Sequence, residues 1–249
     1  MPEHNVYLEP FFGSGAVLFN KPTAKIETIN DIDGNIVNLF KVIREKPQEL
    51  ARVVEFTPYS REEYYQAFEL LEQDLTDVER ARVFLIRCWM ARGGKTSDRT
   101  GWRHNIDTAT INALPDWNGL PNLVLEATKR LKQVQIENQE ATTLIERYNR
   151  ADCLIYADPP YLLETRTKRH YAHEMKNEQH VELLETLNQH EGYVLLSGYD
   201  SDLYNDILKG WTKLTKMATT EGAVSKQEVL WLNPAVSERN HQMNIFEVG

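Results

Sequence analysis

The chain has 249 residues, of which 41% are hydrophobic and 26% are charged, and its formal net charge at pH 7 is −9. This composition is that of an ordinary globular protein, with room for one sizeable α/β domain and an inserted subdomain. The sequence contains no apolar stretch of the roughly 20 residues that a membrane span needs, no secretory signal and no metal-ligand spacing of its two cysteines. We therefore expect a cytoplasmic protein that uses neither a membrane anchor nor a metal ion.

Short apolar runs predict seven strands, and segments of helical spacing lie between them. The strands are expected at residues 6–8, 25–29, 134–136, 153–157, 193–196, 211–217 and 228–232. The helices are expected at residues 16–19, 35–44, 123–131, 140–148, 179–189 and 203–208, with two more between residues 60 and 92. Such alternation of strands and helices implies a parallel sheet that is covered by helices on both faces.

A mainly helical block interrupts this alternation. Ser60 and Glu63 form a capping box at the start of its first helix, and Asp77 is the expected cap of its second helix. Residues 93–122 are polar and contain four glycines and two prolines, so we expect a surface loop there. The predicted organisation is an α/β domain of residues 1–55 and 130–249, with a helical subdomain of residues 56–129 inserted into it.

Three of the predicted strands end in residues that suit ligand binding, which in doubly wound sheets occurs at the carboxyl ends of the strands. The first strand runs into the glycine loop Glu9-Pro10-Phe11-Phe12-Gly13-Ser14-Gly15, where glycine lets the backbone approach a ligand closely. The second ends in Asn30-Asp31-Ile32-Asp33, where an acid suits ribose hydroxyls, although Asp33 also suits the N-cap of the next helix. The fourth ends in Asp158-Pro159-Pro160-Tyr161.

This last motif, DPPY, combines a carboxylate, rigid carbonyl groups and an aromatic face. Each proline fixes φ near −65° and lacks an N–H, so the chain leaves the sheet edge in one direction. Such a loop suits a planar ring with an exocyclic amino group, such as adenine. Two acceptors on the amino hydrogens, Asp158 and the Pro159 carbonyl, favour a pyramidal nitrogen whose lone pair attacks a methyl group. Taken alone, the motif fits a simple turn after a strand equally well.

In this order, EPFFGSG, INDID and ADPPY resemble the motifs of the Dam-type (D12 class) adenine-N6 DNA methyltransferases. The segments VLLSGYDSDLY (194–204) and EVLWLN (228–233) are similar to the late motifs of that family. A glycine motif, a long insert and then DPPY is the order of its α-type members, in which the insert recognises the DNA target. The resemblance covers nearly the whole chain. It implies a Rossmann-like methyltransferase sheet that uses S-adenosylmethionine as the methyl donor.

The resemblance also implies roles for individual residues. The loop from Glu9 to Gly15 would face the methionine part of the donor, Asp31 would hold its ribose, and Asn138 or Glu140 would reach its adenine. The expected cofactor-binding residues are Tyr7, Glu9, Pro10, Phe11, Gly13, Gly15, Asp31, Asn138, Glu140 and Asp158. The expected catalytic residues are Asp158, Pro159, Pro160 and Tyr161, with Tyr161 stacking on an adenine that has been flipped out of the duplex.

Two basic segments are the expected DNA contacts of this acidic chain, because local positive patches rather than the net charge decide DNA binding. The segment from Arg87 to His104 would read base edges, and the segment from Arg166 to His170 would grip the DNA backbone or close over the flipped base. The expected DNA-binding residues are Arg87, Arg92, Lys95, Arg99, Arg103, Arg166, Lys168 and Arg169.

One feature departs from the family pattern. Family members usually carry a GGK-like segment ahead of the first strand, whereas only five residues precede Val6, and Gly93-Gly94-Lys95 lies in the insert. Three explanations remain open at this point: an omitted upstream start, a weakened affinity for the cofactor, or a protein that binds DNA without methylating it.

The function expected from the sequence is site-specific adenine-N6 methylation of duplex DNA. Asp158 favours adenine in DNA, because cytosine-N4 enzymes usually carry Ser at this position, while protein-glutamine and many RNA adenine methylases carry Asn. A monomer is expected, and a cognate restriction endonuclease that acts separately is compatible with this function. The alternative is a cofactor-deficient or non-catalytic DNA-binding protein of the same fold.

Overall fold

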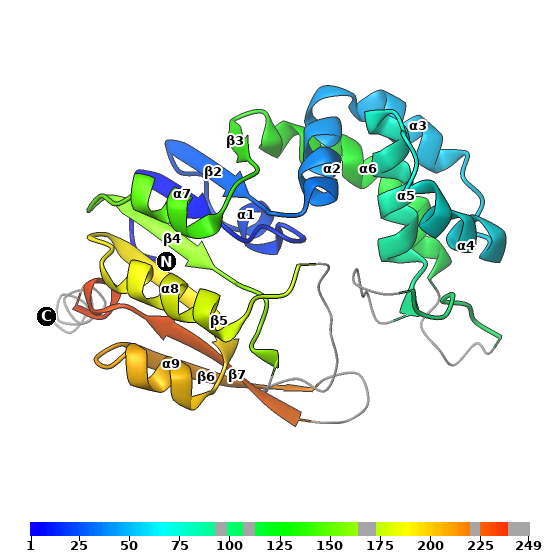
Figure 1. The fold of residues 1–249 in the computed structure, drawn as a ribbon. Coiled ribbons are helices and arrows are strands. Elements are labelled where there is room, and N and C mark those ends of the chain that lie inside the picture. Colours follow the sequence, from blue (N-terminus) through cyan, green and yellow to red (C-terminus); the bar gives the residue numbers. More distant parts are fainter. Residues whose placement is uncertain (93–98, 107–112, 164–172, 220–224, 239–249) are drawn as a thin grey trace, which may run out of the picture. The chain divides into compact units, whose positions relative to one another are not determined.

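The computed structural model describes residues 1–92, 99–106, 113–163, 173–219 and 225–238, and Figure 1 shows its fold. These residues form two compact units: unit 1 contains residues 1–32 and the described residues from 137 onward, and unit 2 contains the described residues of 33–136. The insert predicted at residues 56–129 lies within unit 2. Within the described parts of the chain, no helix is both long and apolar enough to cross a membrane.

A seven-stranded sheet has the strand order β3-β2-β1-β4-β5-β7-β6. The strands are β1 (Val6–Glu9), β2 (Ile26–Asn30), β3 (Val134–Glu137), β4 (Cys153–Ala157), β5 (Tyr193–Tyr199), β6 (Thr212–Thr219) and β7 (Ser225–Leu232). All seven strands were predicted, and β4 has the predicted bounds. β5 runs three residues past its predicted end at Leu196, which brings Ser197 and Tyr199 into the sheet.

The expectation of a wholly parallel sheet is wrong for its last two strands. Strand β1 is parallel to β2 and β4, and β4 is parallel to β5, but β7 is antiparallel to both β5 and β6. Only residues 220–224 separate β6 from β7 in the sequence. That is too short for the crossover of a dozen or more residues that a parallel pair needs.

The strand order reverses between β1 and β4. The chain passes from β1 outward to β2 and β3, and then returns to place β4 on the other side of β1. In open α/β sheets, ligands bind at such a switch point, outside the carboxyl ends of the strands. The strand order therefore points to the ends of β1 and β4, where Glu9 and Asp158 lie.

One face of the sheet in unit 1 carries the main hydrophobic core. Helices α7 (Ala141–Arg147), α8 (Asn177–Asn188) and α9 (Asp202–Ile207) lie against it (Figure 1). The core contains alternate residues of four strands together with apolar residues of these helices: Val6, Leu8, Cys153, Ile155, Ala157, Val194, Leu196, Val229, Trp231, Leu144, Ile145, Leu183, Leu184, Leu187 and Tyr204. Because strand side chains alternate between faces, the intervening residues of these strands point to the opposite face.

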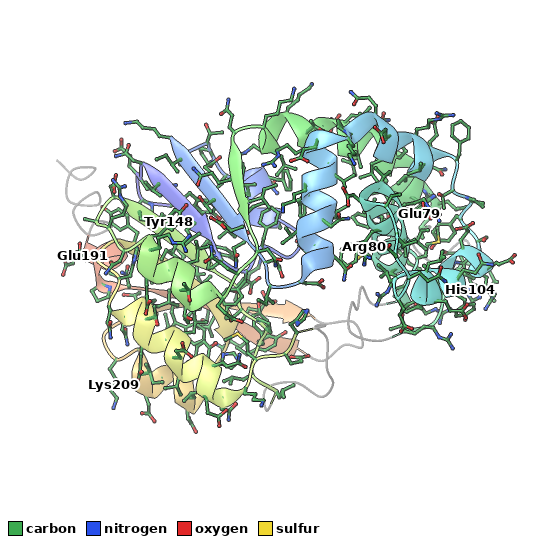
Figure 2. All side chains as sticks on the ribbon, turned by 45° about the horizontal axis from the view of Figure 1, so that its top comes forward. Glu79, Arg80, His104, Tyr148, Glu191 and Lys209 are labelled. Carbon is green, nitrogen blue, oxygen red and sulfur yellow. The ribbon has the colours of Figure 1, made fainter. Side chains whose placement is uncertain are left out.

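The described residues of unit 2 form five helices and the first three residues of β3. The helices are α2 (Gly34–Glu45), α3 (Pro47–Glu55), α4 (Arg61–Leu70), α5 (Asp77–Trp89) and α6 (Leu114–Leu131). The capping bond expected of Ser60 is confirmed, since its side chain accepts from the Glu63 N–H. Thr76, and not Asp77 as predicted, caps α5. Arg82 of α5 reaches Glu63 of α4 at 3.0 Å and also pairs with Glu79, which is labelled in Figure 2.

Two helical predictions in unit 2 were wrong. Helix α3 was not predicted: it begins at Pro47, which lies in the first turn of the helix, where the missing N–H costs nothing. Helix α6 begins at Leu114 and not at Leu123, so the predicted surface loop is helical over residues 114–122. Trp117 explains the difference: it is buried, and its Nε1 donates to the Thr57 carbonyl at 3.1 Å.

Thr128 satisfies a carbonyl that Pro47 leaves without a donor. In α2 the Ile43 carbonyl would accept from the N–H four residues on, but that residue is Pro47 and has none. The Thr128 hydroxyl of α6 lies 2.8 Å from the Ile43 oxygen instead and is buried. We expect Thr128→Val to lower the free energy of unfolding by about 1–3 kcal/mol, the cost of an unsatisfied buried acceptor.

Urea denaturation measures this loss, and the control is Thr186→Val on α8. The Thr186 hydroxyl is exposed and bonds only within its own helix, to Glu182 O, so its removal should change stability by less than about 0.5 kcal/mol. Equal losses in the two variants would contradict the role given to Thr128.

Candidate active site

Several polar side chains lie on the sheet face opposite the core. They come from the carboxyl ends of β1, β4 and β5, and from the part of β7 that pairs with the end of β5. Leu8 pairs with Ile155, Tyr156 with Leu195, and Tyr199 with Glu228. Alternation then directs the following residues away from the core face: Tyr7, Glu9, Tyr156, Asp158, Ser197, Tyr199 and Glu228. Residues far apart in the sequence thus share one face and one edge of unit 1.

Glu9 is a buried carboxylate on this face, with a relative exposure of 2%. The Tyr7 hydroxyl donates to Glu9 Oε2 at 2.7 Å, and Tyr7 itself is fully buried. The pKa of Glu9 is raised to about 7: burial is the largest cause and the negative charge of Asp158 adds to it, while the Tyr7 hydrogen bond and the Lys21 charge oppose the rise. The site therefore contains an acid that changes its charge near neutral pH.

The glycine loop follows Glu9 and leads into α1 (Ala16–Asn20). Both of its glycines have positive φ, 50° at Gly13 and 71° at Gly15. A Cβ at Gly15 would lie 2.4 Å from the Phe12 ring, so glycine is required there by packing. At Gly13 no atom lies within 4 Å of where a Cβ would be, which leaves this backbone open to a ligand. The Gly13 N–H donates to Asp31 Oδ2 at 2.9 Å, and this bond joins the glycine loop to the end of β2.

Asn30, the last residue of β2, joins two loops through hydrogen bonds. Its side-chain Nδ2 donates to the Pro10 carbonyl at 2.9 Å and to the Gln139 carbonyl at 3.0 Å, and its Oδ1 accepts from the Gln139 N–H at 2.9 Å. Its backbone carbonyl accepts from the Phe12 N–H at 2.9 Å. Asn30 is 1% exposed, so these bonds form away from water. They set the position of the glycine loop relative to the loop after β3.

The carboxylate of Asp158 lies in a group of hydroxyls at the end of β4. Tyr161 and Ser197 form hydrogen bonds to it, and these lower its pKa. The surrounding protein has the larger and opposite effect, so the pKa of Asp158 is raised overall although the residue keeps contact with solvent. The same protein environment raises the pKa of Tyr156 to about 12. Asp158 is consequently a stronger base than an ordinary aspartate.

Tyr161 is held by residues of β5. Its hydroxyl lies 3.2 Å from Ser197 Oγ, and its ring meets the ring of Tyr199 edge to face, with 4.6 Å between the ring centroids. Pro159 within the DPPY turn and Leu162 directly after it are buried. The turn is therefore anchored, and Tyr161 has a defined orientation at the sheet edge.

Other residues expected at the donor site occupy different surroundings. Phe11 packs against the core, and Pro10 is buried beside Asn30. Asn138 donates through Nδ2 to the Asp31 carbonyl at 2.7 Å, so it supports Asp31 from the loop after β3. Glu140 is exposed and precedes α7. Asp33 caps α2 by accepting from the Asn35 N–H, which confirms the alternative role considered for it.

Four of the basic residues expected to bind DNA lie within the described residues, all of them in unit 2: Arg87, Arg92, Arg99 and Arg103. Arg87 and Arg99 lie over the rings of Phe68 and Tyr65, at 4.5 Å and 5.1 Å from the ring centroids. The backbones on either side of residues 93–98 pair, with Ala91 opposite Trp102. Arg92 lies opposite Gly101 and is exposed, and Arg103 lies opposite Met90 and is 3.7 Å from Asp116. Lys95, Arg166, Lys168 and Arg169 lie outside the described residues.

The sequence analysis missed two residues that organise the site. Asn30 was noted only as a neighbour of Asp31, and Ser197 was interpreted as the residue after a strand. The signal for Asn30 was an amide directly after an apolar run, and the signal for Ser197 was its spacing of two residues from Leu195, which puts both on the same face of a buried strand. Among the described residues, no group of three or more His, Cys, Asp or Glu side chains is arranged to hold a metal ion.

Comparison with known proteins decides the family. The sequence profile described as D12 class N6 adenine-specific DNA methyltransferase matches residues 1–222. The chain belongs to this family. Adenine-N6 DNA methylation is thus the activity of its class, DNA is the substrate of that class, and the seven-stranded sheet is of the Rossmann-like methyltransferase kind.

Similar proteins include a curated relative and two solved structures. Type II methyltransferase M1.LlaDCHI from Lactococcus lactis subsp. cremoris is 25% identical over 255 residues, which cover 90% of this chain and 84% of that protein. TrmN from Thermus thermophilus has 13% identity and a TM-score of 0.39, over 93% of this chain and 44% of that one. YhhF from Escherichia coli has 11% identity and a TM-score of 0.39, over 92% of this chain and 76% of that one. This chain thus spans less than half the length of TrmN.

The buried charge of Glu9 should make stability depend on pH. Its folded-state pKa of about 7 lies above the ordinary value of 4.5, so the folded protein holds a proton that the unfolded chain releases between these pH values. The contribution of Glu9 to the free energy of unfolding is then fully present below pH 4.5 and is lost as the pH rises through 7, by on the order of 2–4 kcal/mol. We expect Glu9→Gln to be more stable than the native protein at pH 8 and similar to it at pH 5.

Urea denaturation at both pH values tests this expectation, with the exposed Glu146→Gln variant of α7 as the control. A Glu9→Gln variant that is less stable than the native protein at pH 8 would show that the carboxylate is not the source of the pH dependence.

Replacing Asn30 tests how firmly the loops are held. Asn30→Ala removes the three side-chain bonds, which leaves the buried Pro10 carbonyl and the partly buried backbone groups of Gln139 without these bonds. We expect a loss of about 2–4 kcal/mol in the free energy of unfolding. Asn30→Asp should lose at least as much, because a carboxylate cannot donate to the two carbonyls. Asn20→Ala, which removes one exposed amide bond to Ala16 O, is the control and should change stability by less than about 0.5 kcal/mol.

Proposed function

We propose that this chain is a site-specific DNA methyltransferase that transfers a methyl group from S-adenosylmethionine to the N6 amino group of an adenine flipped out of duplex DNA. The observation that carries the proposal is the proximity of two acidic groups with different surroundings at the switch point of the sheet. Glu9 ends β1, Asp158 follows β4, and the negative charge of Asp158 raises the pKa of Glu9. Glu9 suits a cationic methyl donor, and Asp158 suits the target amine.

The residues on the β1 side fit the donor. S-adenosylmethionine supplies a methyl group carried on a positively charged sulfur. Burial disfavours the ionised form of a carboxylate such as Glu9, and a positively charged ligand beside it stabilises that form. The open backbone at Gly13 provides room for close approach, and Asp31, fixed by Gly13 and Asn138, presents a carboxylate suited to ribose hydroxyls.

The residues on the β4 side fit the target amine. Asp158 accepts a hydrogen bond from the amino group and draws its lone pair out of conjugation with the ring, so positioning and electrostatics supply the catalysis. The methylated nitrogen must then release one proton, and the raised pKa of Asp158 makes it a suitable acceptor. Tyr161, held by Ser197 and Tyr199, offers an aromatic surface for a base that has left the duplex stack.

We further propose that the inserted subdomain at residues 56–129 recognises the DNA target. Arg87 and Arg99 lie on aromatic rings of α4, and this contact limits the freedom of two long side chains. Arginines held in this way can present both donors of the guanidinium to a guanine edge. Action in the cytoplasm accords with this function, since both cysteines are free thiols, and a separate restriction endonuclease partner is compatible with it.

Replacing Asp158 tests the role given to it. Asp158→Asn keeps the shape of the side chain but removes the charge, and it should lower kcat for methyl transfer by about 10²–10³-fold, as expected for the loss of one charged acceptor. The measurement is incorporation of labelled methyl groups into unmethylated duplex DNA. Asp200→Asn, on the exposed segment after β5, is the control and should keep the native rate.

Two results would contradict the proposal. Retention of more than a tenth of the native rate in Asp158→Asn, with its fold intact by circular dichroism, would remove Asp158 from the mechanism. Failure of the native protein to bind S-adenosylmethionine at millimolar concentration would favour the non-catalytic DNA-binding alternative.

A further inference from the structure

Lys21 and Glu27 form a buried ion pair next to the candidate donor site. Lys21 directly follows α1, and Glu27 lies on β2. Lys21 Nζ is 2.5 Å from Glu27 Oε1, and the side chains of the two residues are only 3% and 2% exposed. Burying two charges costs about as much solvation as their attraction returns, so such a pair contributes little to stability by itself. Its position suggests a different contribution.

The ammonium of Lys21 contacts the residue that binds Glu9. Nζ lies 4.1 Å from the centroid of the Tyr7 ring, and it also donates to the Pro22 carbonyl at 2.7 Å. The Tyr7 hydroxyl in turn donates to Glu9 Oε2 at 2.7 Å. A continuous series of contacts therefore runs from Glu27 through Lys21 and Tyr7 to Glu9, across β2, the segment after α1 and β1.

We propose that Lys21 is a positioning residue for the donor site: it fixes the Tyr7 ring and, through Tyr7 and through its charge, holds Glu9 as an oriented anion. Glu27 limits this effect by neutralising part of the Lys21 charge. The inference rests on the proposed function in that it takes Glu9 to face the donor, but the effect of Lys21 on Glu9 is measurable without any ligand.

The charged and titratable groups around Glu9 come from four segments. Tyr7 on β1, Lys21 after α1, and Tyr156 and Asp158 at the end of β4 interact with Glu9 directly, while Glu27 on β2 acts on Tyr7 and pairs with Lys21. Asp158 opposes ionisation of Glu9, and Lys21 is the cation that favours it. Glu9 thus lies between a fixed negative neighbour and a fixed positive one, and changing either member of the ion pair should change its ionisation.

Two variants should shift Glu9 in opposite directions. Lys21→Met removes the cation and should raise the titration midpoint of Glu9 by about one pH unit, the lower end of the usual effect of a nearby opposite charge. Glu27→Gln leaves the Lys21 charge without its counterion and should lower the midpoint. The midpoints are measured by carboxyl-carbon NMR of the ligand-free protein labelled at glutamate, and the Glu9→Gln variant identifies the Glu9 signal.

The Glu9 midpoint distinguishes a positioning role from a purely structural ion pair, whereas stability does not. Each single variant leaves one buried charge without its partner and should be less stable, and the double variant Lys21→Met/Glu27→Gln should recover stability whatever the role of the pair. Stability therefore does not distinguish the two roles, but the Glu9 midpoint does. Where Lys21→Met does not fold, the double variant replaces it, and its midpoint should also lie above that of the native protein. Lys213→Met, which breaks the exposed pair with Asp200, is the matched control and should leave the midpoint unchanged.

Donor binding completes the test. Calorimetric titration with S-adenosylmethionine should show affinity about tenfold weaker in the double variant than in the native protein at pH 7, and unchanged in Lys213→Met. A Glu9 midpoint that stays fixed in every variant, or that moves in the same direction in Lys21→Met and Glu27→Gln, would overturn the role of Lys21. Opposite shifts without donor binding to any form, the native protein included, would instead overturn the proposed donor site while leaving the effect of Lys21 on Glu9 established.

Discussion

The buried amide of Asn30 determines how the loops of the candidate site are arranged. Its side chain both donates and accepts, so it satisfies carbonyl and N–H groups that come from different segments of the chain. Pro10 and Phe12 on one side and Gln139 on the other are bound to this single residue at the end of β2. Because the bonds lie away from water, each is costly to leave unmade. The glycine loop is therefore held in one position relative to Asp31.

Electrostatics gives this arrangement its chemical character. Two carboxylates, Glu9 and Asp158, share one edge of the sheet, and the protein around them raises the pKa of both, although Asp158 itself is exposed. A region that disfavours its own negative charges is stabilised by a cation and by groups that donate hydrogen bonds to the carboxylates. A sulfonium donor and an aromatic amine have these two properties. The hydroxyls of Tyr7, Tyr161 and Ser197 orient the carboxylates without neutralising them.

The sequence predicted the fold well wherever local patterns determine structure. All seven strands appear as apolar runs, and Asp33 caps α2, the role that its spacing from Asn35 favoured. The helices of unit 2 were harder to predict, because tertiary packing overrides local signals there. Pro115 and Pro121 marked a loop by their chemistry, yet burial of Trp117 and its bond to Thr57 keep the segment helical.

The site was predicted in part for the same physical reasons. Motifs at strand ends identified Glu9, Asp31 and Asp158, since chain order alone reveals which residues follow a strand. Which face of the sheet each residue occupies depends on register, and register becomes visible only when strands are paired. Ser197 and Asn30 were therefore missed: one acts through its place beside β4, and the other through loops that lie far from it in the sequence.

The central claim is that the donor side and the amine side of the site meet between the ends of β1 and β4. A crystal structure of the protein with S-adenosylhomocysteine, the product of methyl transfer, tests it most directly. The account predicts that the ligand lies along residues 9–15 and Asp31, with its sulfur facing Asp158. A ligand bound elsewhere on the protein, or one that leaves Glu9 and Asp158 on opposite sides of it and out of reach of the sulfur, would contradict it.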